Sequence, residues 1–175
     1  MKPELRGPLK PLSPAFLVGL ALLAASAPAL AQRGGEAAPP SQGLYVYPDY
    51  DNKRDASADL RTAITAATVL DRRILIEVGG DWCIWCHILD RFIAASPEIT
   101  EAFRQSFVVV KVSYSADRPN MTFLGEYPRI PGYPHFFVLE SDGTFLKSQA
   151  TSPLEKGDSY NREKVLDFAR SWASK

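Results

Sequence analysis

The sequence predicts a single α/β domain in which helices cover a central mixed β-sheet. Two β-branched runs, ILIEV at 74–78 and FVVVKV at 107–112, are typical of buried strands. A helical pattern separates them, and a strand–helix–strand order makes the two strands parallel, with a right-handed crossover. Two further strands flank the turn at 140–143 and form a hairpin, which adds antiparallel pairing. The expected fold class is therefore a sheet with both kinds of pairing and helices on its faces.

The residues before this domain predict an export signal. Three of the first ten residues are basic, residues 15–25 form an unbroken apolar run, and small residues at 29–31 precede a cleavage site after Ala31. The run is too short to span a bilayer comfortably, and no cysteine that could carry a lipid follows it directly. The expected exported product begins at residue 32, and an uncleaved membrane anchor is the alternative.

The rest of the chain divides into a linker and the domain. Residues 32–43, QRGGEAAPPSQG, hold almost no large apolar side chain and predict a flexible linker, so the domain is expected to span residues 44–175. Removal of residues 1–31 leaves 17 basic and 19 acidic residues, a balance that does not favour a nucleic-acid surface. A domain of this size buries a core without disulfide staples.

The elements of the domain follow from local patterns. A first helix is expected over about residues 60–70, where apolar residues recur at helical spacing behind Asp55 or Ser57 as the cap. After the strand at 74–78, a helical stripe runs over 83–95, and a second capped helix starts at Ser96. The remaining expected elements, in order, are a strand at 107–112, a polar loop over 115–134, strands at 135–139 and 144–149, and a final helix with its apolar face at 165–172.

The chain has two cysteines, Cys83 and Cys86, which stand three positions apart directly after the first strand. A thiolate, not a thiol, attacks a disulfide, and the start of a helix stabilises negative charge through its free N–H groups and its dipole. If the helix begins near Cys83, the sulfur of Cys83 lies at this position and Cys86 lies one turn further in. Cys83 is therefore the expected nucleophile, and Cys86 is the expected resolving thiol.

The segment ILIEVGGDWCIWC at 74–86 resembles the active-site segment of thioredoxin-like proteins, in which a strand with a buried acid runs into a W-C-x-x-C turn. The stretches GDWCIWCHILDRF, SPEI and IPGYP look most similar to the C-terminal thioredoxin domain of periplasmic transmembrane thiol:disulfide reductases and to small exported thioredoxin-like proteins. This resemblance covers most of the domain. It implies a thioredoxin fold and dithiol–disulfide exchange with protein substrates.

The resemblance also implies roles for individual residues. Glu77 corresponds to the buried acid and is expected to accept the proton of Cys86, although a strand carboxylate that reaches solvent or pairs with a cation is the alternative. Pro134 corresponds to the cis-proline of the family. The backbone at Tyr133 is expected to pair with the substrate chain.

The residues around the cysteines predict the docking surface and the direction of electron flow. Trp82 is expected to shape the surface, with plain core packing of this large aromatic as the alternative. Ile84 and Trp85 replace the usual Gly-Pro and add bulk without charge. The strongest oxidants of this fold carry a histidine inside the C-x-x-C, whereas His87 follows it here, so a reductive potential is expected. Asp90 is expected to be a solvated helix residue.

Three other interpretations remain open. CIWCH at 83–87 matches the attachment signature of c-type haem, for which Met121 and His135 are the candidate distal ligands. Zinc or copper(I) accepts a set of ligands such as Cys83, Cys86, His87 and His135. The domain could also be an interaction module without catalysis.

The sequence favours a monomeric, periplasmic thiol:disulfide oxidoreductase that acts in the reductive direction on protein disulfides. No bound cofactor or metal is expected, because no pattern for binding a nicotinamide or flavin is present, and electrons are expected from a membrane thiol reductase. The expected catalytic residues are Cys83, Cys86 and Glu77, and the expected substrate-binding residues are Trp82, Ile84, Trp85, Tyr133 and Pro134.

Overall fold

The computed structural model describes residues 43–115, 117 and 120–173. The predicted export signal at 1–31 and the predicted linker up to residue 42 lie outside the described residues. Within the described part of the chain, no helix combines the length and the apolar character needed to cross a membrane.

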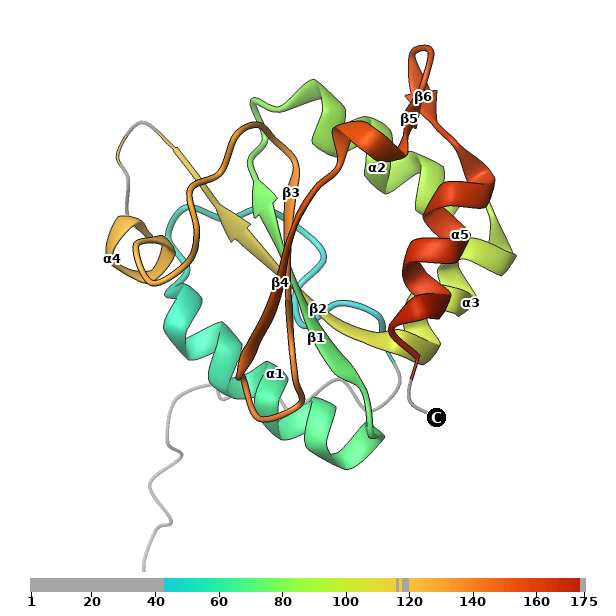
Figure 1. Cartoon of the computed structure of the whole chain (residues 1–175). Helices are drawn as coiled ribbons and strands as arrows, with labels where there is room; N and C mark the ends of the chain where they lie inside the picture. Colours follow the sequence, from blue (N-terminus) through green and yellow to red (C-terminus); the bar gives the residue numbers. More distant parts are fainter. Residues whose placement is uncertain (1–42, 116, 118–119, 174–175) are drawn as a thin grey trace, which may run out of the picture. The chain divides into compact units, whose positions relative to one another are not determined.

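A four-stranded mixed sheet forms the centre of the domain (Figure 1). Its strands are β1 (Arg73–Gly79), β2 (Phe107–Ser113), β3 (His135–Leu139) and β4 (Phe145–Ala150), in the spatial order β2-β1-β3-β4. β1 pairs parallel with β2 and antiparallel with β3, and β3 pairs antiparallel with β4. The predicted mixed sheet, including the crossover and the hairpin, is confirmed.

Helices cover both faces of this sheet (Figure 1). One face packs against α1 (Ala56–Leu70) and the short α4 (Met121–Leu124). The other face packs against α2 (Ile84–Ala94), α3 (Pro97–Ser106) and α5 (Arg162–Ser171). The core therefore consists of two apolar layers separated by the sheet.

The alternation of side chains along β1 places an acid on one of these layers. Ile74, Ile76 and Val78 join the core under α1, and Leu75 joins the core under α2, α3 and α5. Because side chains alternate between faces with a period of two, Glu77 points toward the side of the sheet that α2 covers. Its register partner on β2 is Lys111, which points the same way.

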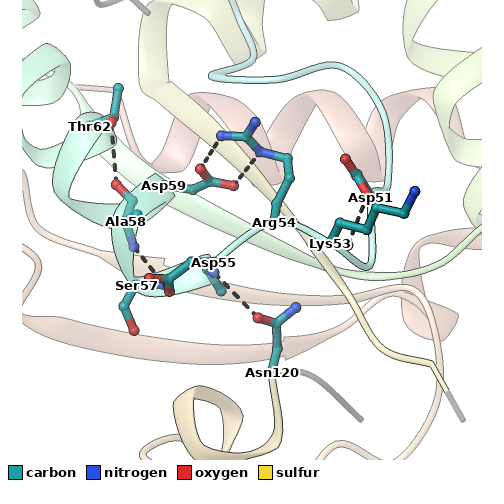
Figure 2. A network of polar contacts seen from close by, with 10 residues as sticks. Asp51, Lys53, Arg54, Asp55, Ser57, Ala58, Asp59, Thr62 and Asn120 are labelled. Carbon is teal, nitrogen blue, oxygen red and sulfur yellow. Dashed lines mark hydrogen bonds and ion pairs between the residues drawn. The ribbon is translucent and has the colours of Figure 1, made fainter. Parts of the chain in front are cut away.

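The residues just before α1 are tied to the body of the domain (Figure 2). The Asp55 carboxylate accepts from the backbone N–H groups of Ser57 and Ala58 and caps the helix, so of the two predicted caps Asp55 is the one used. Arg54 forms a two-pronged ion pair with Asp59. The side chain of Asn120 accepts from the backbone of α1 and donates to the backbone of β2 at 3.0 Å.

The segment before these residues runs beside the sheet. The backbone N–H of Val46 donates to the carbonyl of Val109, and the N–H of Val109 donates to the carbonyl of Leu44, both at 2.8 Å. This pairing extends the edge of the sheet at β2 by one short bridge. Residues 44–50 are thereby led toward the end of β1, where Tyr50 is buried.

Two parts of the chain differ from the sequence prediction. The loop expected over 115–134 contains α4, because Phe123 and Leu124 bury themselves in the core under α1. Between β4 and α5 lie a short helical turn, η1 (Ser152–Leu154), and a small two-stranded hairpin of β5 (Glu155–Lys156) and β6 (Ser159–Tyr160). These pieces are too short to give a periodic pattern.

Candidate active site

Cys83 occupies the N-cap of α2, directly after the turn that follows β1. Its backbone is extended, with φ −90° and ψ 102°, and its sulfur accepts from the backbone N–H of Cys86 at 3.2 Å. The first free N–H groups of a helix and its dipole both stabilise negative charge at this point. The helix therefore supplies the electrostatic environment that a reactive thiolate needs.

Cys83 and Cys86 are joined by a disulfide, with their Cα atoms 5.3 Å apart. Both are buried in this state, with Cys83 4% exposed and Cys86 0% exposed. They pack in one small apolar cluster with Tyr50, Trp85 and Tyr133. Cys83 is the slightly more exposed of the two residues, although it is less exposed than the sequence suggested.

Glu77 is buried beneath the cysteines and is only 1% exposed. The Tyr50 hydroxyl donates to its Oε1 at 2.6 Å. Burial raises the pKa of Glu77 to about 7, opposed by the positive charge of Lys111 and supported by the negative charge of Asp90. The Tyr50 hydrogen bond acts in the opposite direction to burial and lowers the pKa of Glu77. A carboxyl with such a pKa exchanges protons near neutral pH.

Lys111 lies beside Glu77 on β2 and is buried. Its Nζ pairs with both carboxylate oxygens of Asp90, at 2.6 and 2.7 Å. The expectation that Asp90 is simply solvated is therefore wrong. Because the ammonium of Lys111 is held by Asp90, Glu77 has a tyrosine hydroxyl as its hydrogen-bond partner rather than a cation of its own.

Trp82 and Tyr133 form an aromatic rim beside the cysteines. The Trp82 indole N–H donates to the carbonyl of Tyr114 at 2.6 Å, and its ring meets the Tyr133 ring edge-on at 5.3 Å between centroids. Tyr133 in turn stacks on Tyr114. Trp82 is 58% exposed and Ile84 is 63% exposed, so large apolar surface faces solvent next to the disulfide. Such surface is typical of a docking site.

Trp85 lies between the cysteines in sequence and packs inward. Its ring meets that of Tyr160 edge-on, and the Tyr160 hydroxyl reaches the carbonyl of Trp85 at 3.4 Å. Trp85 is only partly buried and also packs against the cluster around the disulfide. Of the two bulky residues between the cysteines, Ile84 is thus the exposed one, and Trp85 contacts β6.

The peptide bond between Tyr133 and Pro134 is cis. Pro134 is buried, and its carbonyl accepts from the Thr151 hydroxyl at 2.7 Å. A pocket of about 210 Å³ adjoins this turn, lined by Tyr133, Pro134, Thr151 and Glu155 among others. The turn and the aromatic rim meet at Tyr133, which contacts both Trp82 and the cysteine cluster.

The structure does not bring together the alternative metal set. His87 Nε2 contacts the carbonyl of Asp81 at 2.8 Å, whereas His135 is buried on β3, with its Nε2 at 2.8 Å from Ser148 Oγ. Burial lowers the pKa of His135. Among the residues the structure describes, no three His, Cys, Asp or Glu side chains form a group able to hold a metal ion.

The structure thus assembles Cys83, Cys86, Glu77, Trp82, Ile84, Tyr133 and Pro134 at one end of the sheet, with Trp85 at the edge of the group. Sequence reasoning missed Tyr50 and Lys111. Lys111 carries a signal that could have been used, since a lysine inside the apolar run at 107–112 requires a buried partner. Tyr50 carries none, because it precedes the first helix in an irregular segment.

Three comparisons with known proteins bear on this site. Residues 55–141 match the family of thioredoxin-like domains. Over 92 residues, the chain is 24% identical to the thiol:disulfide interchange protein DsbD of Pseudomonas fluorescens, a match that covers 53% of this chain and 16% of the relative.

Solved structures also resemble the chain. A disulphide isomerase from Xylella fastidiosa Temecula1 is 23% identical, with a TM-score of 0.59 over 70% of this chain and 94% of that one. The C-terminal domain of DsbD from Neisseria meningitidis, in its oxidised form, is 23% identical, with a TM-score of 0.48 over 67% of this chain and 96% of that one. The isomerase and this chain share a fold, and the predicted resemblance to thioredoxin-like proteins is confirmed.

Proposed function

Because the chain contains a thioredoxin-like domain, we propose that it is a thiol:disulfide oxidoreductase that exchanges the dithiol of Cys83 and Cys86 with disulfides of protein substrates. The observation that carries the proposal is the position of Cys83. Its sulfur caps α2, bonds to Cys86 and lies next to exposed aromatic and aliphatic surface. These are the features that thiolate chemistry on a protein partner needs.

The first step is attack by the Cys83 thiolate on one sulfur of a substrate disulfide. The substrate S–S bond breaks, one substrate sulfur leaves as a thiolate, and the other becomes bonded to Cys83. The start of α2 stabilises the attacking thiolate through its free N–H groups. The product of this step is a mixed disulfide between chain and substrate.

The second step is attack by Cys86 on the sulfur of Cys83. Cys86 loses its proton, a new S–S bond joins Cys83 and Cys86, and the second substrate sulfur is released. Two electrons have then passed from the chain to the substrate. Glu77 is the acceptor for the Cys86 proton, since a buried carboxyl with a pKa of about 7 serves as a base near neutral pH.

Substrate contacts come from the surface around the disulfide. Trp82 and Ile84 offer exposed apolar area, and Trp85 borders it. An extended substrate segment lies against the backbone of Tyr133 and Pro134, next to the pocket that adjoins this turn. This arrangement suits a short apolar segment on either side of a substrate cysteine.

The cellular setting belongs to the same proposal. Residues 1–31 are a cleaved export signal, 32–43 a linker and 44–175 the domain, which acts as a monomer in the periplasm. Electrons flow from this protein to its substrates, because no histidine lies between the cysteines. A membrane thiol reductase returns the electrons, and no bound cofactor takes part. The N-terminal sequence of the exported protein tests the boundary, and we expect it to begin at Gln32.

Single cysteine variants test the activity. With a protein disulfide such as insulin as substrate and dithiothreitol as electron donor, Cys83→Ser is expected to abolish catalysed reduction. Cys86→Ser is expected to accumulate a mixed disulfide that resolves only when a reductant is added. Full activity of the Cys83→Ser protein would contradict the proposal.

A further inference from the structure

Tyr50 contacts both ends of the proton transfer that the second step requires. Its hydroxyl donates to Glu77 Oε1 at 2.6 Å. Its ring packs in the small cluster that holds Cys83 and Cys86. Tyr50 itself is 6% exposed, so the hydrogen bond to Glu77 lies in a largely water-free place.

Cys86 and Tyr50 both approach the backbone at Gly79. A Cβ atom built on Gly79 would overlap both the sulfur of Cys86 and the hydroxyl oxygen of Tyr50, which would lie only 2.7 Å from it. Sγ of Cys86 and Oη of Tyr50 therefore face the same small volume above Gly79. A side chain at this position would collide with both groups, whereas glycine leaves the space open.

The charges around Glu77 leave the tyrosine as its hydrogen-bonding neighbour. Lys111 of β2 is paired with Asp90 of α2, and the rings of Tyr45 and Tyr50 lie 5.0 and 4.8 Å from the Lys111 ammonium. Burial, reinforced by the charge of Glu77, raises the pKa of Tyr50 well above its usual value. Tyr50 therefore remains a neutral hydroxyl, which both donates and accepts a hydrogen bond.

A pocket gives the proton a way out. Tyr50 lines a cavity of about 210 Å³ together with Asp51, Asp81 and Trp82, among others. Several waters fit in this volume, since one water occupies about 30 Å³ of liquid. Of the pair formed by Tyr50 and Glu77, Tyr50 lines this pocket, so the path from Glu77 to water leads through the tyrosine hydroxyl.

We propose that the Tyr50 hydroxyl relays the proton of Cys86 to Glu77 during attack on the mixed disulfide. The proposal rests on the proposed exchange activity and adds a residue to it. Tyr50 Oη takes the proton from Cys86 as it gives its own to Glu77 Oε1, so the tyrosine is neutral before and after. The freed Cys86 thiolate forms the S–S bond to Cys83, the substrate sulfur leaves with the electron pair of the broken bond, and Glu77 later returns the proton to water.

The test separates the two chemical steps with dithiobis(nitrobenzoate), a coloured aromatic disulfide. When the reduced protein is mixed rapidly with this reagent, the first nitrothiobenzoate reports attack by Cys83, and the second reports attack by Cys86. Tyr50→Phe keeps the ring and removes the hydroxyl. We expect it to slow the second release by about 10-fold or more and to leave the first within about two-fold.

Tyr45→Phe is the matched control. The Tyr45 ring also faces the Lys111 ammonium, at 5.0 Å, but its hydroxyl has no hydrogen bond to Glu77. We expect both releases to stay within about two-fold of the parent protein. Equal slowing of the second release by Tyr45→Phe and Tyr50→Phe would overturn the relay, because loss of any nearby hydroxyl would then suffice.

A double-mutant cycle identifies the acceptor. In the Glu77→Gln background, Tyr50→Phe is expected to change the second release by less than about two-fold, since a relay without an acceptor transfers no proton. If the two substitutions multiply their effects, Tyr50 acts through packing and the relay is wrong. If the parent protein releases neither the first nor the second nitrothiobenzoate faster than free cysteine does, the proposed exchange activity itself is wrong. That outcome is distinct from failure of the relay alone.

The pH profile is a second readout that packing alone would not change. The second release in the parent protein is expected to rise as Glu77 ionises near pH 7, and Tyr50→Phe is expected to remove that rise. Should Tyr50→Phe not fold, fluorotyrosine at position 50 keeps the hydroxyl and lowers its pKa. It is then expected to shift the profile, and an unchanged profile would overturn the relay.

Discussion

Two buried carboxylates, Asp59 in α1 and Glu77 in β1, differ in the partners that the fold gives them. Asp59 is 4% exposed and Glu77 is 1% exposed. Asp59 accepts two hydrogen bonds from the guanidinium of Arg54, five residues earlier (Figure 2). Glu77 accepts one from the Tyr50 hydroxyl, and the nearby ammonium of Lys111 pairs with Asp90.

The difference lies in how each carboxylate is held. A guanidinium that binds a carboxylate in two places fixes its charge and its geometry. A carboxyl that has only a neutral donor in a buried site pays the cost of desolvation, and its pKa rises. Asp59 and Glu77 are both buried acids, so it is their hydrogen-bond partners that distinguish them.

The largest expected effect concerns activity. Glu77→Gln is expected to slow the Cys86 step by about 100-fold, the scale of a lost general base, whereas Asp59→Asn is expected to leave it unchanged. The measurement is the second nitrothiobenzoate release described above, at pH 7. Equal rates for Glu77→Gln and the parent protein would remove the chemical role of Glu77.

The next effect is on stability as a function of pH. Because the folded-state pKa of Glu77, about 7, is higher than its unfolded value of about 4.3, the fold favours the protonated carboxyl. The stabilisation is complete below about pH 4.3 and is lost as the pH rises to about 7. The parent protein should lose about 4 kcal/mol over this window relative to Glu77→Gln. Urea denaturation of both proteins across this pH window measures the difference. If their free energies of unfolding change in parallel with pH, the expectation is contradicted.

Asp59→Asn is expected to cost stability without this pH dependence. The substitution leaves the Arg54 guanidinium without its carboxylate at the start of α1, and Arg54 is 31% exposed, so water compensates in part. We expect a loss of about 1–2 kcal/mol in the free energy of unfolding. A matched Arg54→Met variant should lose a similar amount. A loss in only one of the two variants would mean that the pair does not act as a unit.

The smallest expected effect comes from Asp90→Asn. Asp90 raises the pKa of Glu77 through its negative charge, and it also holds the Lys111 ammonium. Removal of this charge lowers the pKa of Glu77, so the pH at which the second release rises should move toward acid. A shift toward alkali would show that the Asp90 carboxylate does not act on Glu77 through its charge.

The sequence predicted the acid but not its surroundings. Glu77 was identified through the resemblance of the segment at 74–86 to thioredoxin-like proteins, in which the strand before the cysteines carries a buried acid. Lys111 on β2 pairs with Asp90 on α2. Its position beside Glu77 depends on the register between β1 and β2, which local sequence patterns do not encode. Asp90 alone therefore looked like an ordinary helix surface residue.

The same reasoning explains what the sequence predicted well. The elements with strong periodicity, such as β1, β2 and α1, were found from their patterns. Tyr50 could not be found, because it comes from an irregular segment positioned by backbone pairing with β2 and by the side chains around Arg54 and Asn120. The turn at Tyr133 and Pro134 was identified through resemblance to a family rather than through any periodic pattern.

The reduction potential of the pair formed by Cys83 and Cys86 tests the central claim most directly. The purified protein is equilibrated with glutathione buffers of known ratio, and the fraction of disulfide is read after acid quenching and thiol alkylation. A reductive exchange protein is expected to give one two-electron transition at about −270 to −200 mV. A value near about −120 mV would contradict the reductive direction, and no disulfide at any ratio would contradict the exchange activity altogether.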